Sequence, residues 1–257
     1  MLGEWRRLVT TLRVSQSATT QRTISALTVI AQQQSEMSRL INYASRHYDT
    51  LKSVFGESLL QRFGIHKYWY DIDGWFTWRA AQEEAVQTFG ENSRFVEVGT
   101  YLGRSLCSLA EVAKQGGKHF TIIGIDTCRG SGPEGSRGKD YHADAVNSGG
   151  GTFAGTLHKN ILDCGFGENI LLIIADSVVA SGIFSERSLD WVHLDARHDY
   201  ASLKADIEAW LPKVKVGGWL SGDDYDVEKW PDVVKSVSDA LPGAKPWSDK
   251  QWRFIVT

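Results

Sequence analysis

The sequence lacks an apolar run long enough to cross a membrane. It also lacks a signal peptide, because the basic start MLGEWRRLVTTLRV has neither an apolar core nor a cleavage site. Cysteine is scarce, and the three residues Cys107, Cys128 and Cys164 form no CxxC pair, which predicts reduced thiols in a cytoplasmic protein. The net charge of −3 shows no excess of basic residues. We therefore expect neither nucleic acid nor a membrane among the partners.

What is present fits a soluble α/β protein. A chain of 257 residues with 42% hydrophobic and 23% charged content suits one α/β domain with an appendage. Ten tryptophans are many for this length. They are expected mostly in packing, and an aromatic-lined substrate site is the alternative.

The N-terminal part carries a heptad pattern between residues 22 and 55. Its positions alternate spacings of three and four: Leu27, Ile30, Gln34, Met37, Ile41, Ala44, Tyr48, Leu51 and Phe55. This pattern predicts a long helix whose seam pairs with another copy of the chain, so we expect a homo-oligomer. The alternative is that the seam packs on the chain's own α/β domain.

The aromatic stretch GIHKYWYDIDGWFTW, residues 64–78, has no clear period. It is interpreted either as a loop over the site or as a packed linker between two domains. Thr77 is then expected to cap a helix that reaches Thr88. On this interpretation residues 1–75 form the helical and linker segment and residues 76–257 form the α/β domain.

The most informative stretch runs from Leu189 to Asp226. Two short apolar runs, at 191–194 and 218–221, are each followed by acidic residues, and a helical pattern lies between them. Strand, helix and strand in this order predict a βαβ unit with parallel strands. The right-handed crossover brings both strand ends to one edge, where ligands of open α/β sheets bind.

Three carboxylates, Asp195, Asp223 and Asp224, are therefore predicted to converge, with His198 one short turn after Asp195. Clustered carboxylates repel one another, and a hard divalent cation such as Mg²⁺ relieves that repulsion. His198 is the nearby group able to take a proton near neutral pH. The competing interpretation makes these acids solvated loop residues or helix caps.

A second pattern precedes this stretch. The strand 94–98 is followed by a turn with GxxxG spacing and by a helix from about Ser105 to Lys114, an arrangement that cradles an anionic or nucleotide cofactor in many α/β folds. The next strand, 120–125, ends at Asp126, which is placed to bind both ribose hydroxyls of a nucleoside.

The remaining segments complete a sheet. Residues 128–152 are rich in Gly, Ser and charge and are expected to form a lid or a disordered loop. A strand at 169–175 ends at Asp176 and Ser177. The final strand, 251–257, is expected to pair antiparallel with a short strand near Trp247.

The motifs EVGTYLGRS (97–105), IDT (125–127), ADS (175–177), LDARHDY (194–200) and GGWLSGDDY (217–225) stand in the order of a known family. From about Gly74 onward the chain resembles class I S-adenosylmethionine-dependent methyltransferases. It is most similar to the metal-dependent branch with the macrocin and mycinamicin sugar O-methyltransferases and the cephalosporin-type methyltransferases. That branch often has Glu-Asp where this chain has Asp223-Asp224, and commonly Gly where it has Ala196-Arg197.

The resemblance implies a Rossmann-like, seven-stranded, mostly parallel sheet with an antiparallel last strand. It implies that Asp195, Asp223 and Asp224 bind Mg²⁺ or another divalent cation and that His198 is the catalytic base. It also implies a set of cofactor-binding residues: Glu97, Gly99, Thr100, Tyr101, Gly103, Ser105, Asp126, Asp176 and Ser177.

The expected activity is methyl transfer from S-adenosylmethionine to a hydroxyl, on a sugar of a natural product or glycan first and on a small phenol second. A metal-independent methyltransferase, a nucleotide-dependent oxidoreductase and a non-catalytic binding module are the alternatives. The GxxxG spacing and the antiparallel final strand count against the oxidoreductase.

Overall fold

The computed structural model describes residues 53–54, 67–134, 138–248 and 250–257. The chain divides into two units, Met1–Lys67 and Tyr68–Thr257, so the aromatic stretch from Tyr68 onward belongs to the second unit. The predicted heptad seam, and with it the homo-oligomer, lies outside the described residues. Within the described ranges, no helix combines the length and the apolar character that crossing a membrane requires.

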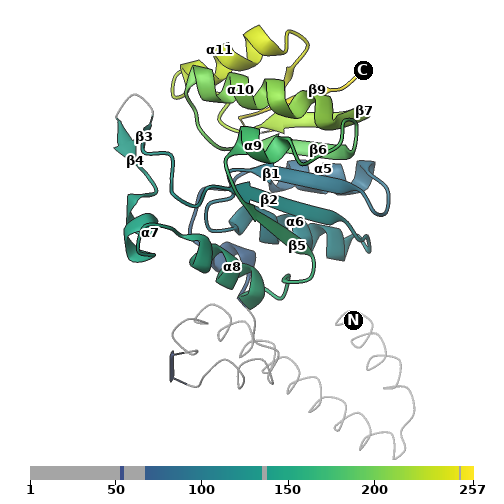
Figure 1. Cartoon of the computed structure of the whole chain (residues 1–257). Helices are drawn as coiled ribbons and strands as arrows, with labels where there is room; N and C mark the ends of the chain where they lie inside the picture. The colour runs from purple at the N-terminus through teal and green to yellow at the C-terminus, as the bar shows by residue number, and fades with distance from the viewer. Residues whose placement is uncertain (1–52, 55–66, 135–137, 249) are drawn as a thin grey trace, which may run out of the picture. The chain divides into compact units, whose positions relative to one another are not determined.

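The second unit is built on one seven-stranded sheet (Figure 1) with the order β5-β2-β1-β6-β7-β9-β8. Its strands are β1 (Arg94–Val98), β2 (Thr121–Asp126), β5 (Ile170–Ile174), β6 (Leu189–Leu194), β7 (Val214–Gly222), β8 (Lys245–Trp247) and β9 (Gln251–Ile255). Five neighbouring strands, from β5 to β7, are parallel, whereas β9 pairs antiparallel with both β7 and β8. The predicted Rossmann-like sheet with an antiparallel end is confirmed.

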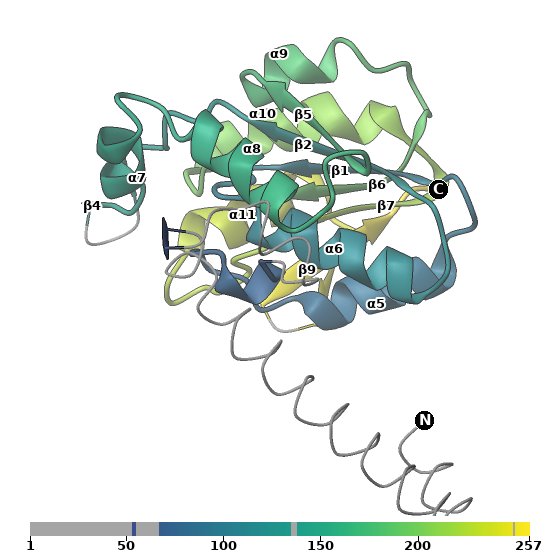
Figure 2. The same cartoon turned by 90° about the horizontal axis from the view of Figure 1, so that it is seen from below.

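Alternating residues of the strands build two hydrophobic cores. On one face, Phe95 and Trp191 pack with α5 (Arg79–Thr88), α6 (Arg104–Gln115) and α8 (Ala154–Asp163). On the other face, Val96 and Val192 pack with α9 (Ser177–Ser181), α10 (Tyr200–Trp210) and α11 (Pro231–Ala240). Figure 2 shows helices on both sides of the sheet. Because side chains alternate along a strand, the central strands β1 and β6 are buried on both faces.

The tryptophans are mainly packing residues, as expected. Those with 1% or less of their surface exposed are Trp78, Trp191, Trp210 and Trp252. Trp75 differs, since 63% of its surface is exposed and it lies in the segment before α5.

Two local expectations need correction. Thr77 does not cap α5, because the N-cap position is Trp78 and its side chain makes no capping hydrogen bond. The segment 128–152 is not a plain loop: it contains a small hairpin, β3 (Pro133–Glu134) with β4 (Lys139–Asp140), and the helix α7 (Ala143–Ser148). Two further short 3-10 helices are η1 (Trp69–Asp71) and η2 (Leu211–Lys213).

Candidate active site

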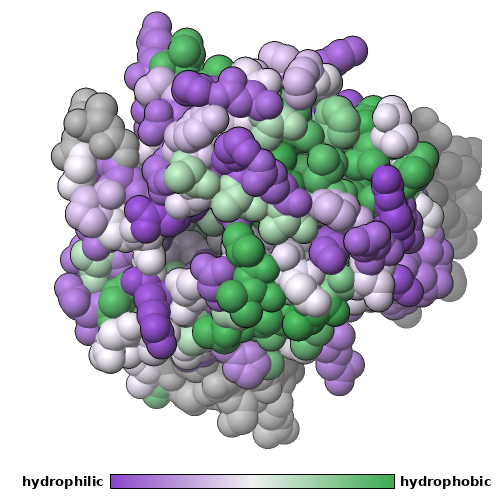
Figure 3. Space-filling view, turned by 45° about the horizontal axis from the view of Figure 1, so that its top comes forward, coloured by the Kyte–Doolittle hydropathy of each residue, from purple (hydrophilic) through white to green (hydrophobic). Residues whose placement is uncertain are grey.

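A pocket of about 690 Å³ opens at the carboxyl ends of the parallel strands. Its walls come from the β1–α6 turn, the ends of β2, β6 and β7, the start of α9 and the strap 73–77. Between β2 and α8 the lining residues are Gly130, Ser131, Glu134, Tyr141 and His142. The space-filling view in Figure 3 shows the surface hollowed left of centre. The register places Val98 beside Leu194 and Leu194 beside Gly222, so the residues following these three strands meet at one edge.

Asp126 connects the turns after β1 and β2, which form one side of this pocket, called the donor side below. Its Oδ2 accepts hydrogen bonds from the backbone N–H groups of Thr100, at 2.8 Å, and Tyr101, at 2.9 Å. Its Oδ1 accepts one from Cys128 N at 2.7 Å. One carboxylate therefore ties together the turns after β1 and β2, and it also lines the pocket.

Glycine is required at position 99 because the backbone just after β6 leaves no room for a side chain there. It has a φ of +85°, and a Cβ at this position would lie 1.9 Å from the carbonyl oxygen of Asp195. The absence of a side chain thus lets the donor-side turn approach the acidic edge directly, as only glycine permits at such a contact.

Glu97 and Gly103 do not line the pocket, although both were expected to contact a cofactor. Glu97 points into the core and accepts a hydrogen bond from the Ser105 hydroxyl; its burial raises the pKa of the carboxyl well above its usual range. Gly103 begins α6 where a Cβ would meet Leu157 at 2.8 Å. These residues support the turn from behind, and the remaining predicted cofactor residues line the pocket: Gly99, Thr100, Tyr101, Ser105, Asp126, Asp176 and Ser177.

The start of α9 forms another part of the wall. Asp176 caps this helix by accepting from Val179 N at 3.1 Å, and Ser177 Oγ accepts from the indole of Trp210 at 2.9 Å. Asp206 of α10 joins them, a residue that the sequence analysis missed. It is 5% exposed, and burial raises the pKa of its carboxyl to about 6.

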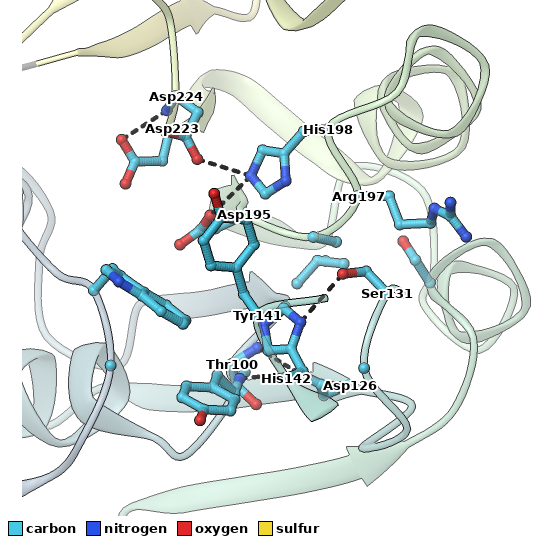
Figure 4. A pocket seen from close by; sticks show the side chains of 18 of the residues that line it. Thr100, Asp126, Ser131, Tyr141, His142, Asp195, Arg197, His198, Asp223 and Asp224 are labelled. Carbon is cyan, nitrogen blue, oxygen red and sulfur yellow. Dashed lines mark hydrogen bonds and ion pairs between the residues drawn. The ribbon is translucent and has the colours of Figure 1, made fainter. Parts of the chain in front are cut away.

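The acidic edge brings together Asp195, His198 and Asp224 (Figure 4). His198 Nε2 lies 2.8 Å from Asp224 Oδ2 and 3.8 Å from Asp195 Oδ1. Potential ligand atoms of all three residues lie within 4.8 Å of one another.

Asp223 lies beside this group with its carboxylate turned away from His198 (Figure 4). Its Oδ1 accepts from the backbone N–H of Asp224 and from Gln251 Nε2, both at 2.7 Å. The three predicted carboxylates are thus neighbours. The residue whose ligand atom lies close to those of Asp195 and Asp224 is His198, while Asp223 is bonded to Gln251.

The charges of the site are strongly coupled. Burial alone would lower the pKa of His198, but its contacts with Asp195, Asp224 and Glu134 raise it to about 12. Burial and mutual repulsion raise the pKa of the carboxyls of Asp195 and Asp223. The contacts of His198 with these carboxylates therefore favour the positively charged form of its imidazole.

Comparison with known proteins decides the family. A family model described as "Methyltransferase domain" matches residues 96–225, which is half of the chain and spans the strands and turns that build the pocket. The chain belongs to this methyltransferase family. The alternative of a nucleotide-dependent oxidoreductase is set aside on this ground.

Individual relatives are distant. An uncharacterized protein y4gI of Sinorhizobium fredii is 31% identical over 138 residues, which make up 53% of this chain and 13% of that protein. The solved O-methyltransferase NovP is 15% identical with a TM-score of 0.50, covering 70% of this chain and 79% of that one. A putative caffeoyl-CoA O-methyltransferase from Staphylococcus aureus is 12% identical with a TM-score of 0.49, covering 82% of this chain and 97% of that one. At such identities the likeness to NovP concerns the fold.

The methyltransferase site also contains an aromatic wall. The ring of Trp75 stacks on Tyr101 with centroids 5.6 Å apart and meets Tyr141 edge to face at 5.7 Å. The strap 73–77 thus lines the pocket, as one interpretation of the aromatic stretch held, whereas Ile72 and Trp78 on either side are 1% exposed and belong to the core.

The residues at the acidic edge fit a divalent cation. Two carboxylates and an imidazole are common ligands of divalent metals. The buried His198 Nε2 makes no hydrogen bond within the described residues, although Asp224 Oδ2 lies 2.8 Å from it. A nitrogen that lies close to two carboxylates is well placed to share a cation with them.

Proposed function

We propose that this methyltransferase moves a methyl group from S-adenosylmethionine to a hydroxyl of a small molecule or sugar, with a divalent cation at its acidic edge. The observation that carries the proposal is one pocket whose walls contain both the Asp126-braced glycine turn and the group Asp195, His198 and Asp224. The first is suited to a nucleoside donor and the second to an acceptor oxygen.

On the donor side, Asp126 is placed at the end of the second parallel strand, where an acidic residue binds ribose hydroxyls in related folds. Asp176 and Ser177 are placed for the adenine, and the turn with Gly99 for the methionine part. Each of these residues lines the pocket, which supports the assignment.

On the acceptor side, Asp195 and Asp224 would hold the cation. A divalent cation acts as a Lewis acid that polarises an acceptor oxygen, a contribution of several kcal/mol. Asp223, predicted as a third ligand, lies next to the group and bonds to Gln251, so it orients the loop after β7. His198 was predicted as the base. Its Nε2 faces Asp195 and Asp224, whereas its Nδ1 contacts Glu134.

The aromatic wall supports a ring-shaped acceptor. Trp75 and Tyr141 offer flat apolar faces in the pocket that the acidic edge also lines, and such faces pack against a sugar or a phenol ring. Binding this ring places its hydroxyl near the donor, and alignment of reacting atoms is a large part of catalysis in two-substrate reactions.

The test is a methyl-transfer assay with S-adenosylmethionine labelled in its methyl group, run against panels of sugars, glycosides and phenols. We expect label in a hydroxyl ether together with release of S-adenosylhomocysteine. The Asp195→Ala variant, which keeps the donor side intact, is the matched control. Label found only on nitrogen or carbon acceptors would contradict the hydroxyl assignment.

A metal-independent methyltransferase is the second candidate. It is favoured by one observation: His198 Nε2 lies 2.8 Å from Asp224 Oδ2, and its contacts with carboxylates raise the pKa of the imidazole and so favour its positively charged form. Assay after removal of cations by a chelator separates the two. Full activity without cation selects this candidate, and loss of activity that Mg²⁺ or Mn²⁺ restores selects the first.

A further inference from the structure

Glu134 contacts His198 across a separation of 64 residues. It belongs to β3, in the segment between β2 and α8 that the sequence analysis treated as a loop. Its Oε1 lies 3.2 Å from the backbone nitrogen of His198, and its Oε2 lies 3.2 Å from the ring Nδ1. Glu134 is 8% exposed, so this carboxylate is buried against the histidine.

The backbone N–H and the ring Nδ1 of His198 therefore each contact a different oxygen of the Glu134 carboxylate. Because the backbone N–H can only donate, it fixes the position of Oε1, and Oε2 is then placed to accept from Nδ1–H. This arrangement holds the second nitrogen, Nε2, as the one that faces Asp195 and Asp224.

Trp230 restrains the same ring from its face. The two rings are stacked with centroids 4.3 Å apart and an interplanar angle of 26°. Trp230 is 7% exposed and follows the loop that carries Asp224. The imidazole is thus held at one nitrogen and one face, and its rotation away from the acids is blocked.

We propose that Glu134 is a positioning residue that holds His198 as a cation ligand through Nε2, together with Asp195 and Asp224. In the arrangement carboxylate–histidine–cation, the cation takes the place of the proton on Nε2, and the outer carboxylate fixes the ring and makes that nitrogen a better ligand. This inference rests on the proposed cation at the acidic edge. It replaces the role of proton acceptor that the sequence analysis gave to His198.

The two roles predict different behaviour of His198→Ala. A ligand role predicts that the variant binds Mn²⁺ at least about 10-fold more weakly than the unmodified protein. A role as base alone predicts unchanged Mn²⁺ affinity and a loss of turnover of about 10²–10⁴-fold.

Glu134→Gln tests the positioning role. A glutamine side chain has one acceptor oxygen and an NH₂ group, so it cannot accept from both the backbone N–H and Nδ1–H. Loss of an outer carboxylate of this kind typically weakens metal binding about 10- to 100-fold. Glu91→Gln is the matched control, because Glu91 Oε2 accepts from the backbone nitrogen of another histidine, His119, at 3.0 Å outside the pocket.

The experiment uses the full chain and Mn²⁺ as the probe. Affinity is measured by titration followed by electron paramagnetic resonance, and coordination by the nitrogen-14 modulation of the Mn²⁺ spin echo. We expect nitrogen modulation in the unmodified protein and in Glu91→Gln, none in His198→Ala, and weaker Mn²⁺ binding in Glu134→Gln. Affinity for S-adenosylhomocysteine, within about two-fold in all variants, shows that the donor side is folded.

Three results would overturn parts of the account separately. Bound Mn²⁺ without nitrogen modulation in the unmodified protein removes His198 from the ligand set. Unchanged Mn²⁺ affinity and modulation in Glu134→Gln removes the positioning role. Failure of the unmodified protein to bind Mn²⁺ at all contradicts the proposed cation itself, and intact methyl transfer in that case leaves the metal-independent enzyme.

Discussion

Replacing Asp126 by Asn should weaken both the fold around the donor site and the binding of S-adenosylmethionine. The aspartate accepts three backbone N–H groups, those of Thr100, Tyr101 and Cys128. Asparagine has one acceptor oxygen, so at least one of these N–H groups must face its NH₂ group. Thr100 and Cys128 are buried, with 3% and 0% of their surfaces exposed.

The magnitude follows from the lost contacts. A hydrogen bond to a charged group contributes about 1.5–3 kcal/mol. For a unit of this size that corresponds to a fall in the melting temperature of about 3–12 °C. If the carboxylate also binds the ribose, the loss of one such bond weakens the donor about 10- to 150-fold.

The two effects are measured separately, by thermal unfolding without ligand and by calorimetric titration with S-adenosylhomocysteine. Asp140→Asn is the control, because Asp140 is exposed and accepts one backbone bond, from His142 at 3.0 Å. A melting temperature as little changed as that of the control would refute the bracing role of Asp126. If the variant unfolds as cooperatively as the unmodified protein and binds S-adenosylhomocysteine with unchanged affinity, the ribose binds elsewhere.

Further outcomes follow from the same structure. Asp224→Ala should lose turnover while keeping donor affinity within about two-fold, and radiometric assay with parallel calorimetry checks both; a loss of donor binding would contradict separate donor and cation sites. For Asp206, burial raises the folded-state pKa to about 6 from the ordinary 3.8, so its contribution to stability is present below pH 4 and is lost as the pH rises to 6. Above pH 6, the free energy of unfolding of Asp206→Asn should therefore exceed that of the unmodified protein by up to roughly 3 kcal/mol. Denaturant unfolding at pH 4 and pH 7.5 measures this difference. A difference that is equal at both pH values speaks against the linkage. Deletion of residues 1–56 should reduce the assembly size seen by light scattering, and a monomeric full-length chain would overturn the oligomer prediction.

The sheet was largely predictable because its central strands are buried on both faces. Short runs rich in apolar residues, such as 94–98 and 191–194, ended at acids or glycines, and the structure places β1 at the predicted Arg94–Val98. The convergence of Asp195 with Asp224 followed from the crossover rule alone. These features depend on local pattern and on topology, both of which the sequence contains.

The contacts inside the site were not predictable in the same way. Gln251 bonds to Asp223 because β9 folds back antiparallel beside β7, and this leaves Asp224 and not Asp223 to face His198. Glu134 reaches His198 from a segment whose composition indicates only a loop. Side-chain direction at a strand end depends on partners that are distant in sequence, and no period or spacing reports them.

The role of Glu97 was misjudged for a local reason. It precedes the glycine turn, so it was expected to contact the cofactor, but alternation along β1 puts it on the face of Phe95. There it pairs in register with His193 of β6, which is also buried. The same alternation, applied to a strand buried on both faces, would have indicated a core position.

The central claim is that this pocket binds S-adenosylmethionine as its donor, and ligand-dependent thermal unfolding tests it most directly. S-adenosylhomocysteine at 100 times its Kd should stabilise the protein by about 2.7 kcal/mol, which for this unit is a rise of about 5–11 °C in melting temperature. NAD at the same concentration should leave the melting temperature unchanged. A rise with NAD and none with S-adenosylhomocysteine would contradict the account.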